Sequence, residues 1–239
     1  KQKIIIASKG IEINSCLFLS QVIKKIINSK NISIISGPCF SSEVSQSLPT
    51  AVTLASPNKK SFDEITELFD SKNFRLYFSN DIIGCQIGGA LKNIYAICCG
   101  IAHAKDVGEN ALGFIVTRSM AEMSRFAVAK GANPITFLGL AGMGDLMATC
   151  TSKLSRNFQL GELIGQGMSL VEAKIKVGQV AEGIRTLAVL HQEASAMKIN
   201  MPIVESLYKI LFDKISSEQL VQDLLDHPNE VDVEFTYKE

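Results

Sequence analysis

Residues 4–10 read Ile-Ile-Ile-Ala-Ser-Lys-Gly, an apolar run that stops at a small residue, a lysine and a glycine. Consecutive β-branched residues favour extended backbone, so the run predicts a strand with Lys9 at its carboxyl end. Ligands of open α/β sheets bind outside such ends, where a lysine can meet an anionic substrate or cofactor. Taken alone, a lysine at a strand end is more often a solvated surface residue.

Further β-branched runs alternate with polar helical stretches through the first 80 residues. This alternation predicts a mostly parallel α/β sheet. The expected strands are 3–7, 32–35, 50–55 and 75–78, and the expected helices are 17–28 and 61–71.

After Asp81 the sequence changes to long segments with helical spacing, rich in Ala, Leu, Met and Gly, which predict an all-helical domain. Ser169 with Glu172 forms a capping-box pattern, and Gly131 and Asn133-Pro134 mark the end of one helix and the start of the next. We therefore expect an α/β domain over 1–80 and a helical domain over 81–239. The expected helices are 87–102, 110–130, 134–140, 155–165, 169–177, 181–197, 203–212 and 217–225.

The charge balance argues against a nucleic-acid or anionic membrane partner. Lys plus Arg equals Asp plus Glu, at 24 each, and no long tract carries one sign. The apolar runs fall short of the roughly 20 residues that a membrane span needs. The chain starts at Lys1 and enters an apolar strand at once, which we interpret as a truncation.

Cysteine and histidine usage favours a reduced, metal-free protein. The six cysteines form no CxxC pair, which is more typical of a reducing cytoplasm than of a disulfide scaffold. The three histidines lie far apart without an HExxH pattern, so no metal site is expected and each histidine is interpreted as a packing or surface residue.

Two motifs place reactive groups next to small residues. In Ser36-Gly37-Pro38 a predicted strand runs into a turn, where Gly37 permits close approach of the backbone to a ligand. In Gly88-Gly89-Ala90-Leu91-Lys92-Asn93 a lysine lies among small apolar residues, which favours its partial desolvation. Desolvation lowers the pKa of a lysine, so its neutral amine can act as a base. The alternative is that Lys92 extends out of its helix into water.

The most specific stretch is Gly139-Leu140-Ala141-Gly142-Met143-Gly144-Asp145-Leu146, followed closely by Ser155-Arg156-Asn157. Arginine offers a planar fork of donors that matches phosphate, and an aspartate accepts hydrogen bonds from hydroxyl groups. A phosphorylated polyol can bind both residue types, its phosphate to the arginine and its hydroxyl groups to the aspartate.

Six motifs, in this order, resemble those of NAD(P)-dependent glycerol-3-phosphate dehydrogenases. They are SKG at 8–10, SGPCF at 36–40, GGALKN at 88–93, GLAGMGDL at 139–146, TCTSKLSRN at 149–157 and GQVAEGIRT at 178–186. The resemblance implies the C-terminal portion of a Rossmann-type parallel sheet over 1–80, followed by a helical domain like that of 6-phosphogluconate dehydrogenase over 81–239.

The resemblance also implies an activity. Enzymes of this family interconvert sn-glycerol 3-phosphate and dihydroxyacetone phosphate with NAD or NADP, and so supply the glycerol phosphate backbone of phospholipids. It implies a cytoplasmic protein with a small-molecule substrate, no nucleic-acid partner and no membrane span, for which a homodimer is one expected assembly.

Residue by residue, the resemblance identifies Lys92 as the proton acceptor for the C2 hydroxyl, with Asn93 and Thr149 in support. Cys39 departs from the hydroxyl residue typical of its position, and a thiol is a weaker hydrogen-bond partner. The expected substrate-binding residues are Lys9, Gly37, Cys39, Lys92, Asp145, Ser155, Arg156 and Asn157. The expected cofactor-binding residues are Lys9, Ser41, Arg156, Val180 and Glu182.

No GxGxxG motif occurs in the 239 residues, and Gly139, Gly142 and Gly144 have the reverse spacing. In the family this pyrophosphate-binding motif lies upstream of SKG. Two alternatives therefore stay open. One is a related 6-phosphogluconate or β-hydroxyacid dehydrogenase, against which the GLAGMGDL and SRN stretches argue. The other is an inactive remnant that folds or dimerises without binding a dinucleotide.

Residues 1–239 by themselves are expected not to turn over glycerol 3-phosphate, because pyrophosphate binding in Rossmann folds depends on a glycine-rich turn at a helix N-terminus. Titration of the purified chain with NADH and NADPH, followed by fluorescence, should show no saturation. Saturable binding together with oxidation of NADH by dihydroxyacetone phosphate would contradict this expectation.

Overall fold

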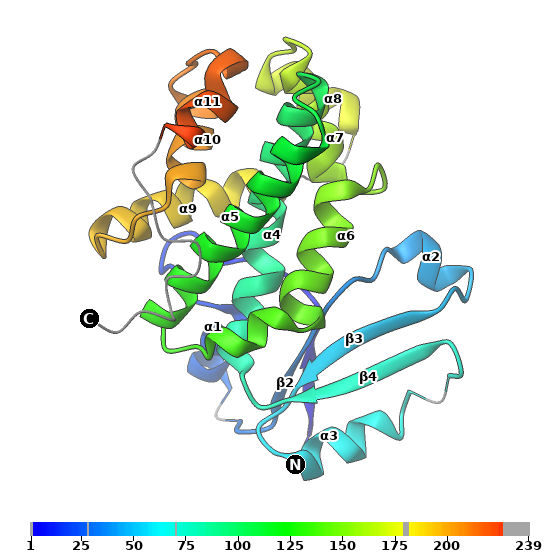
Figure 1. The fold of residues 1–239 in the computed structure, drawn as a ribbon. Helices are drawn as coiled ribbons and strands as arrows, with labels where there is room; N and C mark the ends of the chain where they lie inside the picture. The colour runs from blue at the N-terminus through cyan, green and yellow to red at the C-terminus, as the bar shows by residue number, and fades with distance from the viewer. Residues whose placement is uncertain (1, 28, 70, 179–181, 227–239) are drawn as a thin grey trace.

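The computed structural model describes residues 2–27, 29–69, 71–178 and 182–226. A four-stranded sheet lies against a bundle of helices, with α3 (Lys59–Thr66) on the sheet face away from the bundle (Figure 1). The strands lie side by side in chain order: β1 (Ile4–Ile6), β2 (Ile32–Ser36), β3 (Thr50–Ala55) and β4 (Phe74–Ser79).

Two of the three strand pairings are parallel, as expected of a mostly parallel sheet, and the third is antiparallel. β1 pairs with β2 and β3 with β4 in parallel, but β2 and β3 are antiparallel. The chain between β2 and β3 forms only the short helix α2 (Ser41–Ser45), which lies beyond the end of the sheet (Figure 1). A parallel connection needs a crossover over one face of the sheet, and this segment makes a reversal instead.

Apolar side chains cover both faces of the sheet. On one face, Phe62 and Ile65 of α3 pack on Val52, Leu54 and Leu76. On the other face, β1 and β2 pack against α1 (Leu19–Ile26) and against Cys85 and Ala141 from the helical part of the chain. A strand alternates its side chains between two faces, so this double covering requires apolar residues on both.

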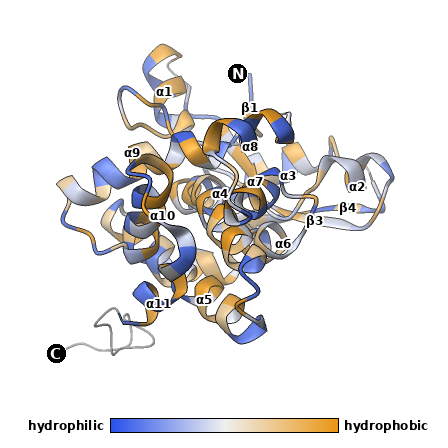
Figure 2. Cartoon of the chain, turned by 90° about the horizontal axis from the view of Figure 1, so that it is seen from above, coloured by the Kyte–Doolittle hydropathy of each residue, from blue (hydrophilic) through white to orange (hydrophobic). Residues whose placement is uncertain are grey.

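Helix α4 (Ile82–Ala104) is the core of the helical part. It packs against α5 (Glu109–Ala129), α6 (Asp145–Thr151), α7 (Arg156–Gly165) and α9 (Glu182–Ala196), and it lies at the centre of the view in Figure 2. Among the described helices it alone has the length and hydropathy of a membrane span, but 89% of that window is buried inside the protein. A helix that is apolar all round is the pattern of a core helix.

The helices after α7 follow the predicted segments, whereas α2 and α6 were not predicted. The capping box predicted at Ser169 is present at the start of α8 (Leu170–Val177). α10 (Pro202–Phe212), the 3₁₀ turn η3 (Ser217–Gln219) and α11 (Leu220–Leu225) complete the described chain.

The helix expected over 134–140 is instead the 3₁₀ turn η1 (Pro134–Leu138) followed by the π turn η2 (Leu140–Gly144). The N–H of Gly144 donates to the carbonyl of Gly139, an i→i+5 bond. Glycine disfavours a regular helix interior, which accounts for the wide turn that leads into α6.

A buried carboxyl group joins α5 to the start of α10. Glu122 Oε1 accepts from the N–H of Ile203 at 2.6 Å, and Oε2 accepts from the N–H of Val204 at 3.4 Å. These are two of the backbone donors that a helix start leaves without partners. Burial raises the pKa of Glu122 to about 8, although the backbone donors and the Arg125 charge oppose that shift.

The raised pKa predicts a loss of stability with increasing pH. A carboxyl whose folded pKa lies above its unfolded value favours folding at low pH and loses that contribution as pH rises toward about 8. The slope for one proton is at most about 1.4 kcal/mol per pH unit. Glu122→Gln keeps an acceptor for α10 and cannot ionise. Denaturant unfolding from pH 5 to 9 should show the parent losing stability relative to this variant. A constant difference across that range would contradict the assignment.

Candidate active site

The motifs singled out from the sequence meet at one cleft of about 480 Å³. The cleft lies beyond the carboxyl ends of β1 and β2, between α2 and the helices α4, α6 and α7. It is lined by Lys9, Cys39, Phe40, Ser41, Ser42, Lys92, Asn93, Thr149, Leu154, Ser155, Arg156, Asn157, Gln159, Val177 and Glu182.

At its base, one carboxylate binds two ammonium groups. Asp145, the first residue of α6, is 1% exposed. Its Oδ2 accepts from Lys9 Nζ at 2.6 Å, and its Oδ1 accepts from Lys92 Nζ. Both carboxylate oxygens thus have a charged donor, which is the condition under which an ionised carboxylate is tolerated in a protein interior.

Thr149, one turn along α6, supplies the second acceptor for Lys92. Its Oγ1 accepts from Lys92 Nζ at 2.9 Å and donates to the backbone carbonyl of Asp145 at 2.6 Å. Since a hydroxyl has a single proton, the bond to the carbonyl leaves Thr149 as an acceptor toward the lysine.

The two lysines differ in their electrostatics. Burial lowers the pKa of Lys92 to about 8, and the neighbouring Lys9 charge adds to this effect, while Asp145 opposes it. For Lys9 burial acts in the same direction, but Asp145 outweighs it and the pKa is raised. Lys92 can therefore exchange a proton near neutral pH while Lys9 stays charged.

An amide pair ties three helices together beside these charges. Asn157 Nδ2 donates to Asn93 Oδ1 at 3.0 Å, and Asn157 Oδ1 accepts from the N–H of Gly183 at 3.1 Å. α7 can lie this close to α4 because Gly161 has no side chain. A Cβ at this position would lie only 2.1 Å from the Ile97 carbonyl oxygen. The close packing places Arg156, at the start of α7, on the cleft wall.

Most of the predicted site residues line this cleft, with three exceptions. Asp145 lies beneath it, with both oxygens bound to lysines. Gly37 is absent from its lining and packs on β3, where an added Cβ would be 3.0 Å from Val52 Cα. Val180 lies outside the described residues. The predicted residues that line the cleft are Lys9, Cys39, Ser41, Lys92, Asn93, Thr149, Ser155, Arg156, Asn157 and Glu182.

Sequence reasoning missed the cleft residues Phe40, Ser42, Leu154, Gln159 and Val177. All five flank or lie inside motifs already singled out, so proximity along the chain was the available signal. Val177, at the end of α8, directly precedes the last of these motifs.

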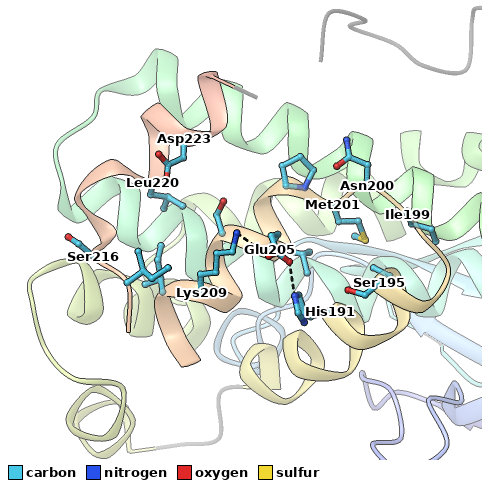
Figure 3. A pocket seen from close by; sticks show the side chains of 16 residues that line it. His191, Ser195, Ile199, Asn200, Met201, Glu205, Lys209, Ser216, Leu220 and Asp223 are labelled. Carbon is cyan, nitrogen blue, oxygen red and sulfur yellow. Dashed lines mark hydrogen bonds and ion pairs between the residues drawn. The ribbon is translucent and has the colours of Figure 1, made fainter. Parts of the chain in front are cut away.

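A second cleft, of about 600 Å³, lies between α9, α10 and α11 and contains none of the predicted site residues (Figure 3). There His191 Nε2 bonds to Glu205 Oε2 at 2.7 Å, and Lys209 pairs with the other oxygen of Glu205 at 3.1 Å. The His191 ring also stacks on Tyr208, with centroids 3.8 Å apart, so this histidine has a packing role. Within the described part of the chain no group of His, Cys, Asp and Glu could hold a metal ion.

Comparisons with known proteins agree on one family. Residues 81–222 match the model of the NAD-dependent glycerol-3-phosphate dehydrogenase C-terminus, and residues 1–62 match that of the N-terminus. A glycerol-3-phosphate dehydrogenase [NAD(P)+] of Pseudomonas syringae pv. tomato is 44% identical over 228 residues, which cover 95% of this chain and 67% of the relative. The corresponding protein of Pseudomonas aeruginosa is 42% identical over the same shares.

Solved structures show the same similarity. The glycerol-3-phosphate dehydrogenase of Coxiella burnetii superimposes with a TM-score of 0.91 at 35% identity, over 95% of this chain and 70% of that one. The yeast glycerol-3-phosphate dehydrogenase superimposes with a TM-score of 0.84 at 24% identity, over 93% of this chain and 67% of that one, which supports the fold alone.

Proposed function

The chain belongs to the family of NAD-dependent glycerol-3-phosphate dehydrogenases, and we propose that its cleft interconverts sn-glycerol 3-phosphate and dihydroxyacetone phosphate with NAD or NADP. The observation that carries this proposal is Lys92, a buried lysine with a pKa of about 8 that lines a cleft shared with Arg156. An alcohol oxidation needs a base at the reacting hydroxyl, and a phosphate ester needs a cation at its other end.

Lys92 serves as the base when its amine is neutral. Two acceptors, Asp145 Oδ1 and Thr149 Oγ1, bind its two remaining N–H groups. The lone pair then occupies the third position on nitrogen, toward the cleft that Lys92 lines. In this orientation the amine takes the proton of the C2 hydroxyl, and in the reverse reaction the ammonium returns it.

Lys9 and Arg156 supply fixed positive charge. Lys9 stays protonated beside Asp145 and stabilises negative charge that develops on the C2 oxygen. Arg156 binds the substrate phosphate through its planar fork of donors. Ser155, the N-cap of α7, keeps that arginine at the cleft wall, because its Oγ accepts from the N–H of Phe158 at 3.3 Å.

The cleft also fits the reactive end of a nicotinamide cofactor. It lies beyond the carboxyl ends of parallel strands β1 and β2, where dinucleotides bind in such sheets. Ser41, Glu182, Lys9 and Arg156 line it and offer hydroxyl, carboxylate and cationic groups to the ribose and phosphates. Bound there, NAD(P) would accept or donate the hydride of the reaction.

We further propose that the sn-glycerol 3-phosphate formed by reduction supplies the glycerol phosphate backbone of phospholipids. We also propose that the protein acts in the cytoplasm and that it assembles as a homodimer. Six free cysteines, four of them buried, suit a reducing compartment. Sedimentation would test the assembly.

Lys92→Met should reduce kcat by about 10²- to 10⁴-fold, the usual cost of losing a general base. The assay requires a protein that also carries a pyrophosphate-binding motif. In the parent, kcat for glycerol 3-phosphate oxidation should rise as pH increases through about 8, as Lys92 loses its proton. Lys60→Met, a change of an exposed lysine on α3, is the control. Near-normal turnover by Lys92→Met would exclude Lys92 as the general base.

Arg156→Lys should weaken substrate binding although it keeps the charge. Arginine can bind phosphate through two hydrogen bonds, whereas lysine makes a single contact. Loss of one charge-assisted hydrogen bond costs about 1.5–3 kcal/mol, which corresponds to a roughly 10- to 100-fold increase in KM for dihydroxyacetone phosphate. Arg75→Lys, on the exposed side of β4, controls for the substitution itself. Equal KM values in parent and Arg156→Lys would disprove the phosphate contact.

A further inference from the structure

We propose that Gly89 is a positioning residue for Lys9: the absence of a side chain at position 89 lets the Lys9 stem lie across α4 and carry its ammonium group to Asp145. The inference rests on the proposed function, in which Lys9 and Lys92 share that carboxylate.

The Lys9 side chain passes directly over Gly89. A Cβ built at Gly89 would lie 3.4 Å from Lys9 Cδ and 3.5 Å from Lys9 Cγ. These distances are ordinary van der Waals contacts for a methyl group, so any atom beyond Cβ has to share space with the lysine stem. The same lysine extends from there to Asp145 Oδ2, 2.6 Å from its Nζ.

Ser36 closes the other side of this space. The Cβ at Gly89 would come within 2.9 Å of Ser36 Oγ, which belongs to the last residue of β2. This hydroxyl is buried and has no hydrogen-bond partner among the described residues. A side chain that grows from position 89 is thus confined between Ser36 and Lys9.

The space between Gly89, Ser36 and the Lys9 stem is small. The cavity bordered by Lys9, Ser36 and Gly89 measures about 10 Å³, at the lower limit for one water molecule. The neighbouring Gly88 has a different task, because its Cβ would lie 2.1 Å from the Ala141 carbonyl of η2. Gly88 therefore allows η2 to approach α4, whereas Gly89 leaves room for a lysine.

Displacement of Lys9 should change the pKa of Lys92, the proposed base. Asp145 would lose one donor and interact with Lys92 alone, and the repelling Lys9 charge would move away from Lys92. Both changes favour the protonated form of Lys92 and raise its pKa. The acid limb of the pH profile is the range in which kcat rises with pH as Lys92 loses its proton. A side chain at position 89 should therefore move this acid limb to higher pH, an effect that simple loss of folded protein does not produce.

The test uses Gly89→Val, with Gly113→Val as its matched control. Gly113 is an exposed glycine inside α5, and a Cβ there meets nothing within 4 Å, so its substitution reports only the helix cost of valine. Gly89→Val should shift the acid limb upward by on the order of one pH unit. Gly113→Val should leave the limb where it is in the parent.

A double-mutant cycle identifies the route of the effect. In a Lys9→Met background, Gly89→Val should cause no further shift, because the group that it displaces is already gone. An equal shift in both backgrounds, or none in either, overturns the proposal. If Gly89→Val does not fold, Gly89→Ser takes its place, because its Oγ lies beyond the Cβ position that Lys9 tolerates. A smaller upward shift is then expected, and an unmoved limb counts against the inference.

The outcome for Lys92→Met separates this inference from the proposed function. Turnover that survives in Lys92→Met means that the limb does not report Lys92, and the proposed function fails. An inactive Lys92→Met with an unmoved limb in the Gly89 variants refutes only the role of Gly89. ¹⁵N NMR titration of the Lys92 amine, without substrate, follows the same shift independently of turnover.

Discussion

Asp145 has almost no exposure to water, and each of its two carboxylate oxygens accepts a hydrogen bond from a lysine. Removing either lysine would leave a buried charge partly uncompensated, which typically costs several kcal/mol. Lys9 belongs to the α/β part of the chain, and Lys92 and Asp145 belong to the helical part. The same ion cluster therefore holds the two parts in register and forms the base of the cleft.

Sharing one carboxylate gives the two lysines different chemistry. Lys92 is the one whose pKa falls into the neutral range, because burial dominates there and Lys9 adds its repulsion. Lys9 gains more from Asp145 than it loses by burial, so it remains a cation. Neighbouring titratable groups with separated pKa values are the usual basis for assigning a base and an electrostatic partner. Gly88 of α4 and Gly161 of α7 permit the close packing on which this geometry depends.

Local sequence signals predicted most elements and most cleft residues, and their failures have physical causes. Apolar runs marked β1 to β4, and the capping box marked the start of α8. A regular helix was expected over 134–140, at the start of the glycine-rich stretch. Glycine instead favoured a π turn, and the turn directs Asp145 inward, beneath the cleft. The antiparallel pairing of β2 with β3 follows from a chain reversal through α2 beyond the end of the sheet, and no strand pattern encodes that reversal.

The sequence by itself determined the types of the elements, the balance of charge and the presence of a lysine among small residues, since these follow from propensity and composition over a few neighbouring residues. Only the tertiary structure decided that Lys9 and Asp145, 136 positions apart, would share a bond. The same holds for which residue faces the cleft and which lies beneath it. Such contacts arise from the way helices and strands pack at close distance, and a linear pattern contains no measure of that distance.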